Sequence, residues 1–160
     1  VPRLLEIIKK GFKIEQSADA VRWTKEAGIE TICNFILGLP SETPEESRQT
    51  IDFALKLDPD YVQFYLTMPY IGTPLYDIAK QHGTILTTSM EDYNRTPWQF
   101  VHYVTAGRTE KELSDLIHGA YKKFYWRPSY IVRRLNSLRQ LPLRRMIDMI
   151  IAGLKMTVRK

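Results

Sequence analysis

An apolar run gives way to a turn and then to a helix start over residues 35–47, which read FILGLPSETPEES. Gly38 and Pro40 end the apolar run. Thr43 and the glutamate three residues later, Glu46, form the pattern of a capping box, in which each side chain accepts a backbone N–H of the other. The segment therefore predicts a buried strand, a tight turn and a helix in succession.

Helix and strand patterns alternate on both sides of this turn. The predicted helices cover residues 2–11, 15–27, 44–57 and 74–81, and the predicted strands cover residues 29–38 and 61–68. The first strand is almost continuously apolar, as a strand covered on both faces would be. This order is typical of βαβ units, so we expect an α/β fold with a parallel sheet.

The pattern changes after Gly83. Residues 84–108 are polar and aromatic, and we expect mostly loop with a strand near residues 100–104. A second capping box, Thr109 with Glu112, opens a helix that reaches about Trp126. Two further helices are expected after Pro128 and over residues 143–158, separated by Pro142. We therefore divide the chain into residues 1–83, 84–108 and 109–160.

Composition limits the chemistry of the chain. Its 160 residues carry a net charge of +5 and suffice for one domain with a core. The single cysteine, Cys33, excludes an internal disulfide and a cysteine-only zinc or iron–sulfur site within these residues. No apolar run has the length of a membrane span, and no signal peptide is visible. The chain lacks an initiator Met and starts inside a helical pattern, so we expect a fragment of a longer protein.

The charge is unevenly distributed. Residues 127–160 hold nine Lys or Arg and one acidic residue, whereas residues 1–126 carry a net charge of −3. A basic end of this kind suits a membrane surface or a nucleic acid. It equally suits a helical face that docks on an acidic part of the same protein, and both interpretations remain open.

The two predicted strands differ in their alternating faces. Asn34 stands in an apolar strand, where its amide needs a partner, so its face is the better candidate for a polar interior. In the second strand Gln63, Tyr65 and Thr67 alternate with apolar residues. A polar face suits a barrel lumen, but an edge strand with one wet face would show the same pattern. Likewise, Gly38–Pro40 could be only a tight turn between strand and helix.

Several motifs in this order resemble a known family. Residues 34–83 resemble the later half of a radical S-adenosylmethionine (SAM) domain, in which a G-[LF]-P-x-E-T element follows the fifth barrel strand and P-x-x-G-T-P-L-Y follows the sixth. Residues 11–29, GFKIEQSADAVRWTKEAGI, resemble the preceding helices. Residues 124–135, FYWRPSYIVRRL, resemble the cobalamin-binding branch, with its magnesium-protoporphyrin ester cyclase-like and hopanoid-associated enzymes.

The resemblance implies the later units of an incomplete, TIM-type βα barrel followed by a helical extension. It implies an enzyme in which a [4Fe–4S] cluster cleaves SAM to a 5′-deoxyadenosyl radical. Ile36 and Gly38 match the segment that packs against adenine, and Pro40 and Glu42 match the turn behind it. Asn34 stands where many relatives carry Asp. The end of the sixth strand, whose backbone meets the adenine edge, corresponds to Thr67, Met68 and Pro69.

The chain departs from the family where the cluster is concerned. The three-cysteine motif C-x-x-x-C-x-x-C is absent, so cluster ligands, and any cobalamin site, would lie outside this chain. We expect no catalytic residue or metal ligand here, and we interpret Cys33 as a buried packing residue. The three histidines, His82, His102 and His118, are interpreted as structural.

The expected partners follow from the same resemblance. They are the N-terminal remainder of the protein and a small-molecule, lipid-like or porphyrin substrate, in a cytoplasmic protein. The basic end leaves a contact with the inner face of the membrane open. The alternative function is a non-catalytic basic module that binds a membrane or RNA. RNA is disfavoured because no aromatic residues are interleaved with the basic ones over residues 131–160.

Overall fold

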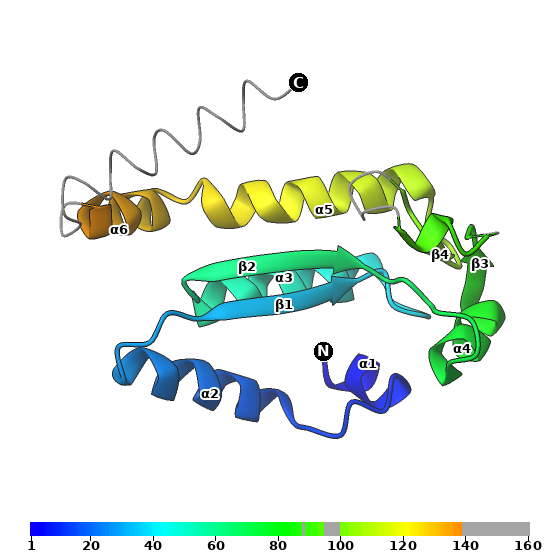
Figure 1. The fold of residues 1–160 in the computed structure, drawn as a ribbon, viewed down its shortest axis with the longest axis horizontal. Helices are drawn as coiled ribbons and strands as arrows, with labels where there is room; N and C mark the ends of the chain where they lie inside the picture. Colours follow the sequence, from blue (N-terminus) through cyan, green and yellow to red (C-terminus); the bar gives the residue numbers. More distant parts are fainter. Residues whose placement is uncertain (88, 95–99, 139–160) are drawn as a thin grey trace. The chain divides into compact units, whose positions relative to one another are not determined.

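The computed structural model describes residues 1–87, 89–94 and 100–138. The chain forms two compact units, Val1–Phe124 and Tyr125–Lys160, and each is considered by itself. The first unit contains helices α1 (Pro2–Ile7), α2 (Ile14–Glu26), α3 (Pro44–Leu57), α4 (Pro74–His82) and α5 (Glu110–Tyr125), and strands β1 (Ile32–Leu37), β2 (Tyr61–Leu66), β3 (Gly83–Ile85) and β4 (Tyr103–Thr105) (Figure 1). A short 3₁₀ helix covers Asp92–Asn94.

The central feature of this unit is a pair of parallel strands. β1 and β2 run side by side, with Ile32 opposite Tyr61 and Leu37 opposite Leu66 (Figure 1). The connection between them is α3, as in a βαβ unit. The predicted α/β class with parallel strands is therefore confirmed.

The two faces of this sheet differ sharply. The side chains of Val62, Phe64 and Leu66 are buried, and Phe64 meets Tyr121 of α5 edge to face at 5.4 Å. The opposite face is open to solvent and carries Ile32, Asn34, Ile36, Tyr61, Gln63 and Tyr65. The expectation that β1 is covered on both faces was wrong for the described chain, because Ile32 and Ile36 remain 59% and 42% exposed.

The outer edge of β2 is closed by a side chain. The Tyr121 hydroxyl accepts the N–H of Phe64 at 3.0 Å and donates to the C=O of the same residue at 3.2 Å. In β2, Tyr61 and Thr67 direct their N–H groups toward the β1 side, to Thr31 and Leu37. The N–H and C=O groups of successive residues in a strand point to alternate sides, so those of Phe64 face away from β1. Tyr121 therefore occupies the position that a further strand would take at Phe64.

The predicted capping boxes are present. Thr43 Oγ1 accepts the N–H of Glu46 at 3.2 Å, and the Glu46 carboxylate accepts the N–H of Thr43 at 3.0 Å. Thr109 and Glu112 make the same pair of bonds at the start of α5. Because each box satisfies N–H groups that have no partner in the helix, both helix starts could be read from the sequence.

The segment after α4 holds an antiparallel pair that was only half predicted. The strand expected near residues 100–104 is β4, but its partner β3 was expected to be loop. β3 follows α4 without a connecting residue. Gly83 makes this possible: a Cβ at this position would lie 2.2 Å from the Val104 carbonyl oxygen. Such a short strand leaves no periodic pattern in the sequence.

The second unit contains α6 (Pro128–Leu138), the helix expected after Pro128. The helix predicted over residues 143–158 and the proline before it lie outside the described residues. Among the helices that are described, none is long and apolar enough to cross a membrane.

Candidate functional site

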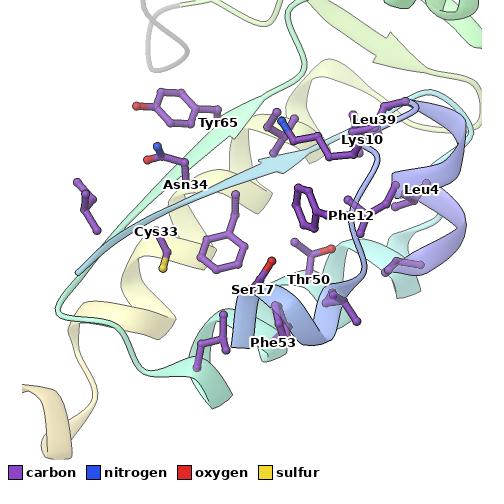
Figure 2. Close-up of a pocket in the computed structure, with 18 of the residues that line it drawn as sticks. Leu4, Lys10, Phe12, Ser17, Cys33, Asn34, Leu39, Thr50, Phe53 and Tyr65 are labelled. Carbon is purple, nitrogen blue, oxygen red and sulfur yellow. The ribbon is translucent and has the colours of Figure 1, made fainter. Parts of the chain in front are cut away.

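A groove of about 980 Å³ runs along β1 and past its carboxyl end (Figure 2). Its walls come from α1, α2, the loop between them, β1, α3 and the segment that follows β2. Figure 2 shows Phe12 and Phe53 directed into it, with Asn34 and Tyr65 at the open sheet face. A mainly apolar lining with a few polar groups is typical of a small-molecule site.

Four of the eight predicted cofactor-contact residues line this groove. They are Asn34, Ile36, Thr67 and Met68. The other four, Gly38, Pro40, Glu42 and Pro69, are buried in the turn after β1 and the loop after β2 and do not line it. The structure thus divides the predicted set into a groove-facing half and a half behind the groove.

Gly38 serves the packing of the turn. Its φ of +72° lies in the left-handed region that favours glycine, and a Cβ here would approach Leu113 of α5 to 3.3 Å. In the structure, the space that a side chain at this position would need is taken by α5.

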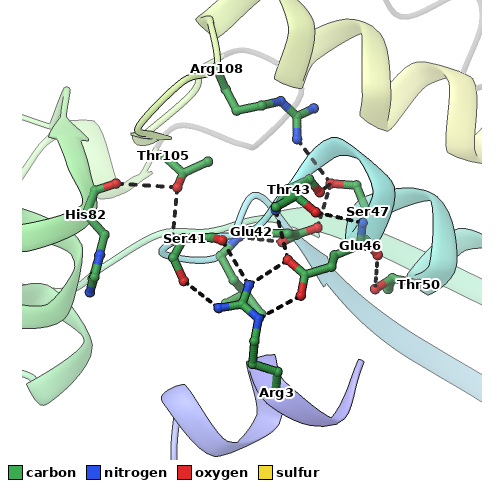
Figure 3. A network of polar contacts seen from close by, with 11 residues as sticks. Arg3, Ser41, Glu42, Thr43, Glu46, Ser47, Thr50, His82, Thr105 and Arg108 are labelled. Atoms are coloured by element: carbon green, nitrogen blue, oxygen red, sulfur yellow. Dashed lines mark hydrogen bonds and ion pairs between the residues drawn. The ribbon is translucent and has the colours of Figure 1, made fainter.

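Glu42 holds the turn from inside. Its carboxylate is almost fully buried and accepts the N–H of Leu39 and the hydroxyl of Ser47, both at 2.6 Å (Figure 3). Arg108 donates to the same Ser47 hydroxyl at 3.2 Å. Burial raises the pKa of Glu42, while its hydrogen bonds oppose the shift. The structure therefore shows Glu42 in contact with the backbone of its own turn.

A second carboxylate, Glu46, is held from α1. Arg3 donates to both of its oxygens, at 2.8 and 2.6 Å, and also to the hydroxyl and carbonyl of Ser41, at 3.0 and 2.9 Å (Figure 3). The hydrogen bond from Arg3 is the main cause that lowers the pKa of Glu46 to about 2. Sequence reasoning assigned Glu46 to the helix start but missed Arg3, because no spacing rule links residues 43 positions apart.

The ends of the two strands are tied to each other. Thr67 is buried, and both its N–H and its hydroxyl donate to the carbonyl of Leu37, at 3.0 and 3.1 Å. Two residues later the carbonyl of Pro69 accepts the hydroxyl of Tyr93 at 2.9 Å. These hydrogen bonds fix the backbone at Thr67 and Pro69, two of the predicted contact residues after β2.

The histidines and the cysteine lie apart from one another. His102 is buried beside the Thr87 hydroxyl at 3.0 Å, His82 ends α4, and His118 is exposed, with Nδ1 2.7 Å from the Ser114 carbonyl. Cys33 is half-buried in the groove wall, less covered than expected, and burial raises its thiol pKa. Among the residues that the structure describes, no three His, Cys, Asp or Glu side chains gather as metal ligands would.

Comparison with known proteins gives a consistent group of relatives. No protein-family profile matches the chain. An uncharacterized methyltransferase from Pyrococcus horikoshii is 39% identical over 134 residues, which cover 82% of this chain and 28% of that protein. The anaerobic magnesium-protoporphyrin IX monomethyl ester cyclase of Cereibacter sphaeroides is 28% identical over 76% of the chain and 19% of its own length. A lipoyl synthase from Acidothermus cellulolyticus is 43% identical over 51 residues, 32% of this chain and 16% of that protein.

These relatives are radical SAM proteins, which confirms the resemblance drawn from the motifs. The chain is thus similar, over most of its own length, to members of the radical SAM superfamily. It spans less than a third of the length of each of these relatives. SAM and a [4Fe–4S] cluster are cofactors of the family.

Proposed function

We propose that the chain is the C-terminal part of a radical SAM enzyme and forms part of the wall against the adenine of SAM. The observation that carries this proposal is the half-open sheet. One face of β1 and β2 is packed, and the other presents polar and aromatic side chains beside a groove at the carboxyl ends of the strands. Ligands of parallel α/β proteins bind at this end.

The open face is explained if the sheet is the end of an incomplete βα barrel. In a barrel the face with Asn34, Gln63 and Tyr65 would turn toward the lumen, and α3 and α5 would lie outside. Tyr121 closes the outer edge of β2 at Phe64. The remaining strands would therefore join at the free edge of β1, and the part of the groove past the carboxyl ends of the strands, beside Leu39, Met68 and Tyr70, would stay open for the ligand.

The groove has the chemistry that an adenine ring needs. Ile36 and Met68 offer apolar contact to the ring faces, and the Asn34 amide can donate and accept hydrogen bonds at the ring edge. The ordered ends of both strands keep backbone groups in place. Gly38, Pro40, Glu42 and Pro69 would act behind this wall by fixing its shape.

The cluster cannot be held by these residues. Cys33 is the chain's single cysteine and lies half-buried in the groove wall, so three thiolate ligands would have to come from outside the 160 residues. In the family the reduced cluster supplies the electron that cleaves SAM to a 5′-deoxyadenosyl radical. Any cobalamin would likewise be bound outside this chain. Asn34, Ile36, Thr67 and Met68 would bind and orient the nucleoside and exclude water from it.

The substrate class is proposed from the relatives. One is called a methyltransferase and another a cyclase of a magnesium-protoporphyrin ester. We therefore propose a small-molecule substrate, with a porphyrin or a lipid-like molecule as the first to be tried.

The proposal is tested on a chain extended to the length of its relatives. The protein is reconstituted anaerobically with iron and sulfide, and its absorption spectrum and the formation of 5′-deoxyadenosine under reduction are recorded. A cluster together with SAM cleavage is the expected result. A chain that folds but shows neither would overturn the proposal.

A matched pair of variants tests the adenine wall. Ile36→Glu places a charge in the groove and is expected to weaken SAM binding at least tenfold. Ile29→Glu makes the same change at an exposed position that does not line the groove and should leave the affinity unchanged. Equal affinities for both variants would remove Ile36 from the proposed site.

A further inference from the structure

Three side chains from residues 93–108 reach the carboxyl ends of both parallel strands. Thr105 and Arg108 hold the turn after β1, and Tyr93 holds the loop after β2. We propose that these three are positioning residues, here called the brace, which set the shape of the groove wall at the cofactor end. That the ligand is SAM rests on the proposed function; the brace itself rests on the contacts below.

Thr105 acts on the most strained residue of the turn. Ser41 is a non-glycine residue with φ of +61°, a conformation that costs free energy unless the surroundings fix it. The buried Thr105 hydroxyl accepts the N–H of Ser41 at 3.0 Å and donates to the carbonyl of His82 at 3.4 Å. One hydroxyl thus connects the turn to the end of α4 (Figure 3).

Arg108 acts through Ser47 on the buried carboxylate. Its guanidinium donates to the Ser47 hydroxyl, which in turn donates to Glu42, and Glu42 accepts the N–H of Leu39. Leu39 lines the groove, so this chain of bonds ends at the wall itself. The positive charge of Arg108 also favours the ionised form of Glu42, which holds both hydrogen bonds.

Tyr93 acts on the second strand end. Its hydroxyl donates to the carbonyl of Pro69, and its ring stacks on Tyr70, with ring centroids 4.9 Å apart. The Tyr93 ring also lies nearly parallel to the buried His102 ring, with ring centroids 6.1 Å apart. Tyr70 and Met68 both line the groove, so Tyr93 fixes the wall at the β2 side.

The brace connects two segments that share no sequence motif. Residues 34–83 carry the family motifs, whereas the brace residues lie in a segment that showed no clear pattern. Since none of the three lines the groove, their effect on a ligand would be indirect. They should therefore change the affinity for SAM more than the rate of any later step.

The first readout does not depend on SAM. Hydrogen–deuterium exchange of residues 36–43 is compared in Thr105→Val, Thr105→Ser and the unmodified protein, all as folded full-length chains. Exchange of this turn should rise at least threefold in Thr105→Val and stay close to the unmodified value in Thr105→Ser, which keeps the hydroxyl. Thr84→Val, an exposed position on the neighbouring strand β3, is the matched control and should have no effect.

The second readout is the affinity for SAM, measured with the cluster-loaded, full-length protein. Arg108→Gln and Tyr93→Phe should each raise the KM for SAM about threefold to tenfold with kcat within twofold, the range expected for one hydrogen bond. Arg48→Gln removes the same charge from an exposed position on α3 and should leave the KM unchanged. Arg108→Lys, which keeps the charge, should retain part of the affinity that Arg108→Gln loses.

The outcomes separate the brace from the proposed function. Increased exchange in Thr105→Val without any SAM binding would keep the brace and overturn the SAM site. SAM binding with unchanged exchange in Thr105→Val and an unchanged KM in Arg108→Gln and Tyr93→Phe would overturn the brace. A fall in kcat with an unchanged KM would also contradict it, since that would mark a catalytic rather than a positioning role.

Discussion

Two glutamates four residues apart show how position sets the behaviour of a carboxyl group. Burial raises the pKa of Glu42, whereas the guanidinium of Arg3 lowers that of Glu46. Both residues were read from the sequence as parts of a turn and a helix start. The opposite shifts of their pKa could not be predicted from the sequence, because the burial of Glu42 and the contact of Glu46 with Arg3 both arise from tertiary packing.

The lowered pKa of Glu46 predicts a loss of stability in acid. A carboxyl whose pKa falls from 4.5 to about 2 on folding stabilises the folded chain above pH 4.5, and this contribution is lost as the pH falls toward 2. Because Arg3 is about half exposed, we expect only about 1 kcal/mol, well below the unscreened value. Urea unfolding of Glu46→Gln and of the unmodified chain at pH 7 and pH 3 measures it.

The control for this prediction is Glu45→Gln on the same helix turn, whose carboxyl is exposed and pairs with the exposed Arg48. It should leave the pH dependence nearly unchanged. If Glu46→Gln and Glu45→Gln lost equal stability between the two pH values, the ion pair with Arg3 would not be the cause.

Two features require a glycine at position 38, the positive φ and the close contact with Leu113, and their costs can be measured separately. Gly38→Ala should destabilise the chain by about 2 kcal/mol, since an alanine pays for the positive φ and also meets Leu113 at 3.3 Å. Gly72→Ala has a similar φ of +80° with no atom nearby, so it should lose only about 1 kcal/mol. Thermal unfolding of both variants gives the difference.

A second substitution checks the cause. Leu113→Ala removes the side chain in contact, so the additional loss at Gly38 should shrink in the double variant. An additive double variant would mean that the backbone alone explains the cost.

At the scale of the element, local signals determined what the sequence could predict. The starts of α3 and α5 were predicted because each capping box is contained within four residues. The alternation of β2 correctly predicted one polar-aromatic face. β3 was missed because its three residues form a strand only through their pairing with β4. The open face of β1 was missed because continuous apolar character does not say what covers a strand.

The helix α6 belongs to the basic end of the chain, residues 127–160, for which a membrane surface was one expected partner. Its neighbour Trp126 is 74% exposed, and the exposed residues of the helix include Ile131, Val132 and Leu135. Apolar side chains beside arginines suit an anionic membrane surface. We expect the chain to co-sediment with anionic vesicles at low salt and to be released at high salt.

A tryptophan pair makes this test specific. Trp126→Ala should weaken vesicle binding severalfold, whereas Trp23→Ala, an exposed tryptophan of α2, should not. Equal loss in both variants, or no binding to anionic vesicles at low salt, would remove the membrane hypothesis.

At the scale of the whole molecule, one face of the sheet has no cover in the described chain. The exposed side chains on it include Ile32, Ile36, Tyr61 and Tyr65. If barrel strands complete this face, the 160-residue chain should bind a hydrophobic dye such as ANS, and the chain extended to the length of its relatives should bind much less. Equal dye fluorescence per molecule would contradict the barrel proposal.

The closed edge of β2 has a consequence for how this sheet meets other polypeptides. Strands with unsatisfied backbone groups act as templates that recruit further strands, whether from the same protein or from another copy. At Phe64 that template is already occupied by one phenolic oxygen, which satisfies a donor and an acceptor together. A strand that joined β2 on this side would have to displace Tyr121, whereas none of these bonds guards β1, so that completion of the fold and unwanted association would compete for the same edge of β1.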